Sequence, residues 1–153
     1  MLWGWLIAIG SVLFVLIVIF QFMRWYVAAE VTRARRTFPA QKDLVQNEFY
    51  RIASASGKPR GVRWKELQWG QQTEFLRHRQ TAQICVLIGV TIRFEAVEGS
   101  DMVHVEAVND PKNATAMFVY HQGQWHPTEK AIFNLNPDEA AEQFEEHYER
   151  LGT

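Results

Sequence analysis

This 153-residue sequence lacks a second cysteine, positively charged side chains near its start and the residue spacings of common catalytic motifs. One cysteine, Cys85, excludes an internal disulfide and agrees with a reducing compartment. No lysine or arginine precedes Arg24, whereas a secretory signal peptide begins with a basic segment. The five histidines form no HxxxH or HExxH pair, and residues 57–61 lack the spacing of a phosphate-binding loop. These absences argue against a helix-borne zinc site and a P-loop.

A long apolar run is present instead at the start of the chain. Residues 2–20 contain no charged side chain, and Ser11 is the only polar one. About 20 apolar residues cross roughly 30 Å of hydrocarbon, and such a segment must be helical because unpaired backbone amides are costly in lipid. Both ends of the run carry the aromatic residues typical of membrane interfaces, namely Trp3, Trp5, Trp25 and Tyr26. We therefore predict a transmembrane helix over residues 1–23.

The charges that flank this run predict its orientation. The N-terminal side offers only the α-amino group, whereas the other side carries Glu30 and four arginines, Arg24, Arg33, Arg35 and Arg36. Since positive flanks stay in the cytoplasm, we expect the N-terminus outside and the C-terminal domain in the cytoplasm. The four arginines, with Trp25 and Tyr26, are predicted contacts of the bilayer surface. Two alternatives are a cleaved signal peptide, with a faint cleavage-like triplet at residues 27–29, and a buried core helix.

The net charge of −1 hides two halves of opposite sign. Residues 24–93 carry 13 basic and 5 acidic side chains, whereas residues 94–153 carry 3 basic and 12 acidic ones. A basic half beside the membrane suits an anionic inner leaflet. The acidic half disfavours nucleic acid as a partner and suits a basic protein surface. The predicted partners are the lipid bilayer and either another protein or a second copy of this chain, although two solvated faces of an ordinary domain would give the same counts.

The rest of the chain divides into a stalk and one domain. Residues 24–40 form a predicted basic stalk, helical to about Thr37 and ended by Pro39, because proline disfavours the helical conformation of the residue before it. Residues 41–153 are long enough for one domain with its own core. That domain begins with a predicted amphipathic helix over residues 41–56.

Alternation of apolar residues predicts a series of strands after this helix. The longest, residues 83–98, has one wholly apolar face and a glycine, Gly89, at the expected bend. Gln122 and Gly123 are predicted to form a tight hairpin turn. The other predicted strands are residues 62–69 and 73–79, joined by a turn at 70–72, and residues 102–108, 114–121, 124–126 and 130–135.

The end of the domain has a strong helix signal. Asn136 is a favourable N-cap, Pro137 suits the first helical position, and acidic residues follow, so we predict a helix over residues 136–150. The fold class is α+β: a transmembrane helix, then an antiparallel meander sheet flanked by an N-terminal and a C-terminal helix on one face. A long bent strand around an N-terminal helix resembles cystatin-like and NTF2-like domains in outline, and no motif supports that resemblance.

Polar residues on the predicted strands form a candidate pocket. Arg93 and Glu95 share a strand face, as do His104 and Glu106, and cross-strand ion pairs are the ordinary explanation of such pairs. The predicted hairpin would place His121 opposite Gln124 and Val119 opposite His126, so the two histidines would lie diagonally on one face. A third metal ligand is missing there, and we predict no metal and no cofactor. The candidate pocket residues are Arg93, Glu95, His104, Glu106, His121 and His126.

Basic and aromatic residues form a second candidate, an interaction patch of Arg60, Arg63, Trp64, Lys65 and Trp69. Tryptophan and arginine are enriched at protein interfaces and at membrane surfaces, whereas core packing is the default expectation for the two tryptophans. Cys85 lies in an apolar strand and is predicted to be a buried hydrophobe, not a nucleophile.

No constellation of residues assigns a reaction, so no catalytic residue is predicted. We expect a single-pass membrane-anchored protein whose cytoplasmic domain is a non-catalytic scaffold, assembly or protein-interaction module. The alternative is a domain that binds a small ligand, or acts on one, in a pocket between the curved sheet and the helices.

Overall fold

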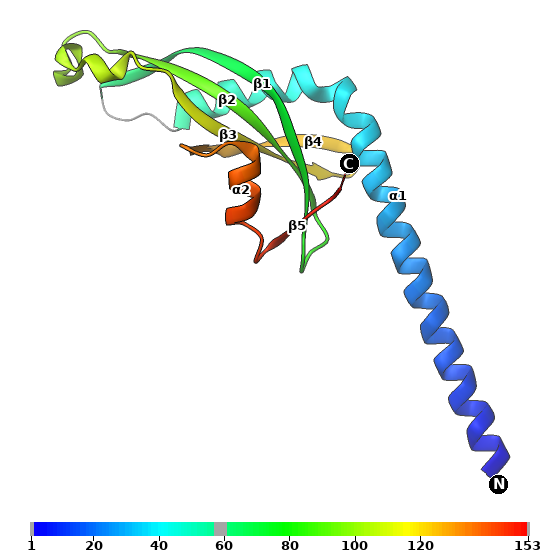
Figure 1. Cartoon of the computed structure of the whole chain (residues 1–153). Helices are drawn as coiled ribbons and strands as arrows, with labels where there is room; N and C mark the ends of the chain where they lie inside the picture. The colour runs from blue at the N-terminus through cyan, green and yellow to red at the C-terminus, as the bar shows by residue number, and fades with distance from the viewer. Residues whose placement is uncertain (1, 57–60, 153) are drawn as a thin grey trace.

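A single N-terminal helix is the longest element of the computed structural model, which describes residues 2–56 and 61–152. Helix α1 (Leu2–Ser56) runs into the domain without interruption (Figure 1). Its residues 9–26 are exposed, and an 18-residue window of the helix reaches a mean hydropathy of 2.1. Residues 2–56 and 61–152 therefore contain one helix that is long and apolar enough to cross a membrane.

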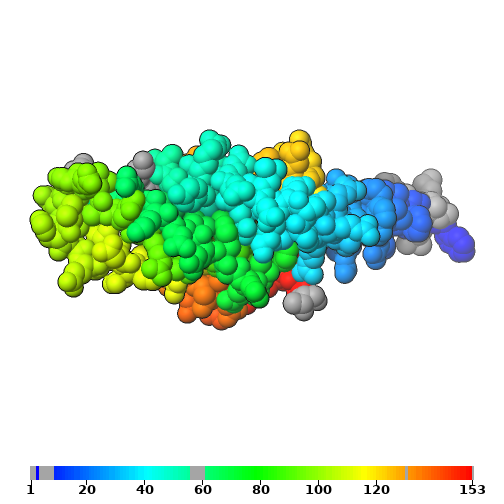
Figure 2. All heavy atoms as spheres, turned by 90° about the horizontal axis from the view of Figure 1, so that it is seen from above, coloured from blue at the N-terminus to red at the C-terminus, as the bar shows by residue number. Residues whose placement is uncertain are grey.

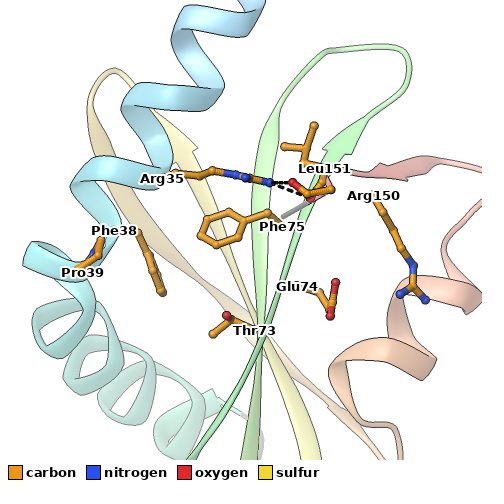
Figure 3. Close-up of a pocket in the computed structure, with 9 residues that line it drawn as sticks. Arg35, Phe38, Pro39, Thr73, Glu74, Phe75, Arg150 and Leu151 are labelled. Atoms are coloured by element: carbon orange, nitrogen blue, oxygen red, sulfur yellow. Dashed lines mark hydrogen bonds between the residues drawn. The ribbon is translucent and has the colours of Figure 1, made fainter.

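Pro39 lies inside α1, so the prediction that it ends the helix is wrong. Figure 1 shows a bend in α1 where its straight lower part meets the domain, and Figure 3 places Phe38 and Pro39 at that bend. Proline removes one helical hydrogen bond and crowds the preceding turn, which kinks a helix when contacts hold both sides. Phe38 and Val45 are buried on either side of Pro39 and supply such contacts. The predicted stalk and the first domain helix are thus one element.

The exposed segment between the apolar run and the domain is short. Glu30 already lines a hollow together with His121 of the sheet, and Ala34 is fully buried. From Met23 to Glu30 a helix rises about 10 Å at 1.5 Å per residue. The domain therefore begins close to the end of the apolar run, within the segment of residues 24–40 that we expected to be a stalk.

In the described part of the chain, five strands form one antiparallel sheet in the order β4-β3-β2-β1-β5. Their bounds are β1 (Val62–His78), β2 (Ile84–Ala96), β3 (Lys112–His121), β4 (Gln124–Phe133) and β5 (Tyr148–Arg150). Strands β1 to β4 follow one another as an antiparallel meander, in which residues 124–126 and 130–135, predicted as two strands, belong largely to the single strand β4. Strand β5 returns to the outer edge of β1. Gln122 and Gly123 turn the β3–β4 hairpin with positive φ angles of 50° and 85°. Figure 1 shows that the sheet curls strongly along its strands.

Strand β1 is continuous, so the predicted hairpin turn at residues 70–72 is wrong. Trp69 pairs with Val90 and Thr73 with Ile88, which leaves these three residues opposite Gly89 alone. A Cβ atom on Gly70 would lie 3.1 Å from the carbonyl oxygen of Gly89, so the two backbones approach closely here. The bend expected at Gly89 therefore exists, but the extra residues that produce it belong to β1.

Strand β2 carries the core on both of its faces. One face turns toward α1 and is buried at every alternate position, as predicted, at Ile84, Val86, Ile88, Val90, Ile92 and Phe94. On this side the ring of Phe49 from α1 lies 5.6 Å from that of Trp69 and 5.8 Å from that of Phe118. Aromatic rings therefore fill the space between α1 and the sheet.

The C-terminal helix packs on the opposite face of the sheet. Helix α2 (Pro137–Gln143) places Ala140 and Ala141 against a second cluster of buried residues, which contains Leu76, Cys85 and Leu87. The two helices thus cover opposite faces, where we expected both on one. Asn136 caps α2 as predicted, since its side chain accepts from the Glu139 amide and the Glu139 carboxylate accepts from the Asn136 amide, both at 2.9 Å.

Helix α2 ends at Gln143, so the prediction that it continues to about Arg150 is wrong. Residues 148–150 form β5, which pairs with Leu76, Arg77 and His78 of β1. The main-chain hydrogen bonds of an open sheet edge outweigh a helix propensity that is worth only tenths of a kcal/mol per residue.

The end of the molecule opposite the N-terminus is a pair of short 3-10 helices, η1 (Asp101–His104) and η2 (Glu106–Val108) (Figures 1 and 2). A strand was predicted over residues 102–108, because its valines alternate. Val103 and Val105 are exposed here, so the alternating valines do not form the buried face of a strand. The acidic half of the chain supplies this distal tip and also β3 and β4, which meets α1. Its charges are therefore not confined to the end far from the membrane helix.

Candidate functional site

The junction between α1 and the sheet is held by side-chain hydrogen bonds. The indole Nε1 of Trp125 donates to the Ala34 carbonyl at 3.2 Å. Gln41 accepts from the Trp125 amide at 2.9 Å through Oε1 and donates to the Gly123 carbonyl at 3.2 Å through Nε2. Trp125 is buried, and the Phe38 ring lies edge-on to it at 5.2 Å. The helix that carries the apolar run is therefore fixed to the β3–β4 hairpin on both sides of its bend.

Arg35 joins the same part of α1 to the segment that follows β5 (Figure 3). Its guanidinium donates to the carbonyls of Leu151, at 2.7 Å, and Gly152. The guanidinium also lies 5.3 Å from the centre of the Phe75 ring, in the range of a cation–π contact. Arg35 was predicted to contact the membrane surface, and its hydrogen bonds are instead made within the domain.

A hollow of about 450 Å³ opens beside Arg35, between the bend of α1, the end of β1 and the C-terminal segment. Phe38, Pro39 and Phe75 give it an apolar wall, and Glu74 and Arg150 stand at its rim (Figure 3). Arg150 is committed to Asp138, and that hydrogen bond raises the pKa of Arg150. The Glu74 carboxylate forms no ion pair or hydrogen bond with another side chain among the described residues, and its negative charge also helps to raise the pKa of Arg150. The hollow could accept an apolar group with a donor or a cation at one end.

The other predicted membrane-surface residues lie along the free part of α1. Trp25 and Tyr26 are exposed at 67% and 60%, as residues that meet headgroups would be. Arg24 lies 5.9 Å from the centre of the Phe20 ring, and Arg33 forms an i,i+3 ion pair with Glu30 at 3.6 Å. Arg36 is exposed. These side chains remain available to the bilayer surface.

The six candidate pocket residues are not brought together. Arg93 pairs with Glu66 at 3.8 Å, and Glu95 pairs with Arg63, so both belong to ordinary cross-strand ion pairs. His104 and Glu106 lie in the 3-10 helices of the distal tip. His121 and His126 lie in the hairpin with the predicted register and are exposed. No group of three metal-ligating side chains occurs among the described residues.

The interaction patch is divided between core and surface. Trp64 is buried, and both Trp64 and Trp69 pack on the ring of Phe49, so the two tryptophans contribute to the core. Arg63 and Lys65 are exposed on β1, while Arg60 lies outside the described residues. Cys85 is buried as predicted, and loss of solvation raises the pKa of its thiol to about 12. A thiol of that pKa is not a nucleophile at neutral pH.

Sequence reasoning missed the residues that join α1 to the sheet, namely Gln41, Phe75, Trp125 and Leu151. Each has the local pattern of an ordinary helix or strand residue, because its partner across the junction lies at least 37 positions away in the chain. The Gln-Gly turn before Trp125 was the one usable signal, since it fixed which strand positions face each other.

Comparison with known proteins found no match in any of three searches: family models, curated proteins and solved structures.

Proposed function

We propose that this protein is a single-pass membrane protein whose cytoplasmic domain is a non-catalytic interaction module held close to the bilayer. One observation carries the proposal: the apolar segment and a core helix of the domain are the same helix, α1. The junction at Trp125, Gln41 and Arg35 supports it further, because these bonds hold the domain against the helix. A domain joined in this way would have a defined height and orientation above the membrane, which suits assembly with a neighbouring protein.

The proposed orientation has the N-terminus outside and the domain in the cytoplasm. Support comes from the exposed arginines Arg24, Arg33 and Arg36, which follow the apolar run, and from the absence of basic residues before it. The buried Cys85 permits a simple test, since its thiol is unreactive at neutral pH.

Membrane-impermeant maleimide should distinguish the two orientations. We expect Trp3→Cys to be labelled in intact cells, and Asp101→Cys, at the distal tip, only after the membrane is opened. Labelling of Asp101→Cys in intact cells would reverse the topology. Recovery of both variants in the soluble fraction would overturn the membrane proposal itself.

The interaction role is tested by cross-linking in membranes followed by purification in mild detergent. We expect one protein to be recovered reproducibly with the chain in near-equal amount. Repeated recovery of the chain alone, at native expression levels, would contradict an assembly or scaffold role.

A small-ligand role is the second candidate, and the hollow beside Arg35 favours it. Its apolar wall and the Glu74 carboxylate at its rim suit a ligand with an apolar body and a donor or cationic group. Native mass spectrometry of the chain released from detergent should then show a bound small molecule, and Phe75→Trp should remove it by filling the hollow.

The shape of the domain supports one further proposal. A helix across a curled antiparallel sheet has the outline of cystatin-like or NTF2-like domains, and this outline does not assign a function.

A further inference from the structure

The outer edge of β1 is open along most of its length. Strand β5 pairs with β1 only at residues 76–78, and one further hydrogen bond runs from the Leu151 amide to the Phe75 carbonyl at 2.8 Å. Between Val62 and Gln72, the described residues place no strand and no backbone hydrogen bond on this side. Figure 2 shows this part of the chain, in green, reaching the surface between α1 and α2. Such an edge is a template for pairing with another extended chain.

The ladder identifies main-chain groups that point outward. The Val97 amide donates to the Gly61 carbonyl at 2.9 Å, so Gly61 faces β2. Because the direction alternates along an antiparallel strand, Val62 and Trp64 direct their amide and carbonyl groups away from β2. Their side chains are buried and hold the backbone of this edge in place, while its outward groups have no hydrogen-bond partner among the described residues. A strand that added here would meet a preformed surface.

Side chains beside the edge indicate what the added strand would carry. Tyr50 of α1 is 38% exposed and its ring lies 6.3 Å from that of Trp64, which gives an apolar contact on the α1 side. Lys65 is the extra residue of a bulge between Trp64 and Glu66, and it is exposed. Whereas Arg63 pairs with Glu95 and Glu66 with Arg93, Lys65 has no ion-pair partner in the described part of the chain.

We propose that the edge of β1 from Val62 to Gln72 binds an extended segment of a partner protein, which adds to the sheet beside β1. Apolar side chains of this segment face Tyr50, and an acidic side chain lies beside Lys65. The chain already uses the same mode, because β5 adds to this edge and the open part continues directly from it. The proposal rests on the interaction role proposed above and names the surface that performs it.

The test uses the full chain in lipid nanodiscs and a displayed library of decapeptides with β-branched residues at alternate positions. Selected peptides should slow hydrogen exchange of the outward amides of Val62 and Trp64 by at least about tenfold. The Arg63 amide points into the sheet and serves as the internal control, since it is bonded with or without peptide. Peptides rich in acidic residues should be enriched, and Lys65→Glu should weaken them by about fivefold to tenfold, while Lys42→Glu on α1 should not.

A second variant blocks the edge without changing β1. Strand β5 runs toward Phe75, so an extension of about eleven strand-forming residues after Thr153 would continue along the open edge, and it should abolish peptide binding. Peptides that bind this variant equally well, or that protect residues 101–108, would overturn the proposal. So would protection of Val62 and Trp64 that rises with protein concentration alone, because a second copy would then occupy the edge. Peptide binding to the edge of β1 does not require a particular membrane orientation. A maleimide result that contradicts the proposed topology would therefore not by itself contradict the proposed binding edge.

Discussion

The two parts of α1 are equally helical and differ in what surrounds them. Residues 9–26 are exposed and mostly apolar on all sides, whereas the later part buries one stripe, including Ala34, Val45, Phe49 and Ala53, against the sheet. A helix that is apolar all round needs lipid, and a helix with an apolar stripe needs a sheet or another helix. One continuous helix is therefore suited to two environments, with a proline near the change.

Charges placed in the first part should have the largest effect and should affect only membrane insertion. In the double variant Leu13→Arg and Leu16→Arg, each arginine should cost about 2.5–3.5 kcal/mol of insertion free energy. We expect loss of flotation with liposomes and an unchanged urea midpoint of the domain. Replacement of the same two leucines by isoleucine is the control. Unchanged flotation of the arginine variant would show that this segment does not lie in hydrocarbon.

Truncation in the second part should have the opposite pattern. Phe49 is fully buried between α1 and the sheet, so Phe49→Ala should lower the free energy of unfolding by about 3–5 kcal/mol, through lost burial and a cavity. Urea denaturation followed by tryptophan fluorescence measures this loss, and flotation should not change. Leu44 is 70% exposed on the same helix, and Leu44→Ala should stay within about 0.5 kcal/mol of the unaltered chain. Similar losses from the two variants would place the core elsewhere.

Between the two parts of α1, replacing Arg35 should lower the free energy of unfolding more than replacing its neighbour Arg36. Arg35→Met removes the hydrogen bonds to Leu151 and Gly152 but keeps most of the side-chain volume, so we expect a loss of about 1–2 kcal/mol. Hydrogen exchange of the Leu151 amide should also accelerate, since β5 would lose its tie to α1. Arg36 is exposed, and Arg36→Met should leave both measurements unchanged. An equal response to the two variants would mean that charge, and not this contact, holds the C-terminal segment.

The effect that is smallest at neutral pH concerns the face of the sheet away from α1, because it appears only in alkaline solution. Burial raises the pKa of Cys85 to about 12, so the folded chain keeps this proton after the unfolded chain has released it. Stability from this group is complete below the unfolded pKa of about 8.5–9 and falls by up to about 1.4 kcal/mol per pH unit as the pH rises toward 12. Urea titrations from pH 7 to 10.5 should show a steeper decline for the unaltered chain than for Cys85→Ala. Parallel declines would contradict the burial of an ionisable thiol there.

Sequence patterns predicted the elements whose signals are local. The apolar run predicts the first part of α1, the alternation of residues 83–98 predicts β2 with a bend at Gly89, and Gln122-Gly123 predicts the register of the β3–β4 hairpin. Asn136 and Pro137 predict the start of α2. In each case the deciding interaction lies within a few residues or within one face of one element.

Other predictions failed where the deciding contact is distant in the chain. Pro39 resembles a stop, but contacts on both sides keep α1 helical through it. Residues 70–72 resemble a turn, but pairing with β2 on both sides makes them a bulge. For the candidate site the same holds, because Trp64 and Trp69 look like an exposed patch until Phe49 is packed against them.

By itself, then, the sequence determined that the chain has a membrane-length helix, a two-faced central strand and defined start signals, because lipid, alternation and capping act over short distances. Only the tertiary structure decided that α1 is also a core helix, that α2 lies on the opposite face, that Arg35 binds the C-terminal segment and that the edge of β1 is open. These features depend on which distant segments meet, and burial and main-chain pairing across the sheet outweigh the weak local preferences of the residues involved.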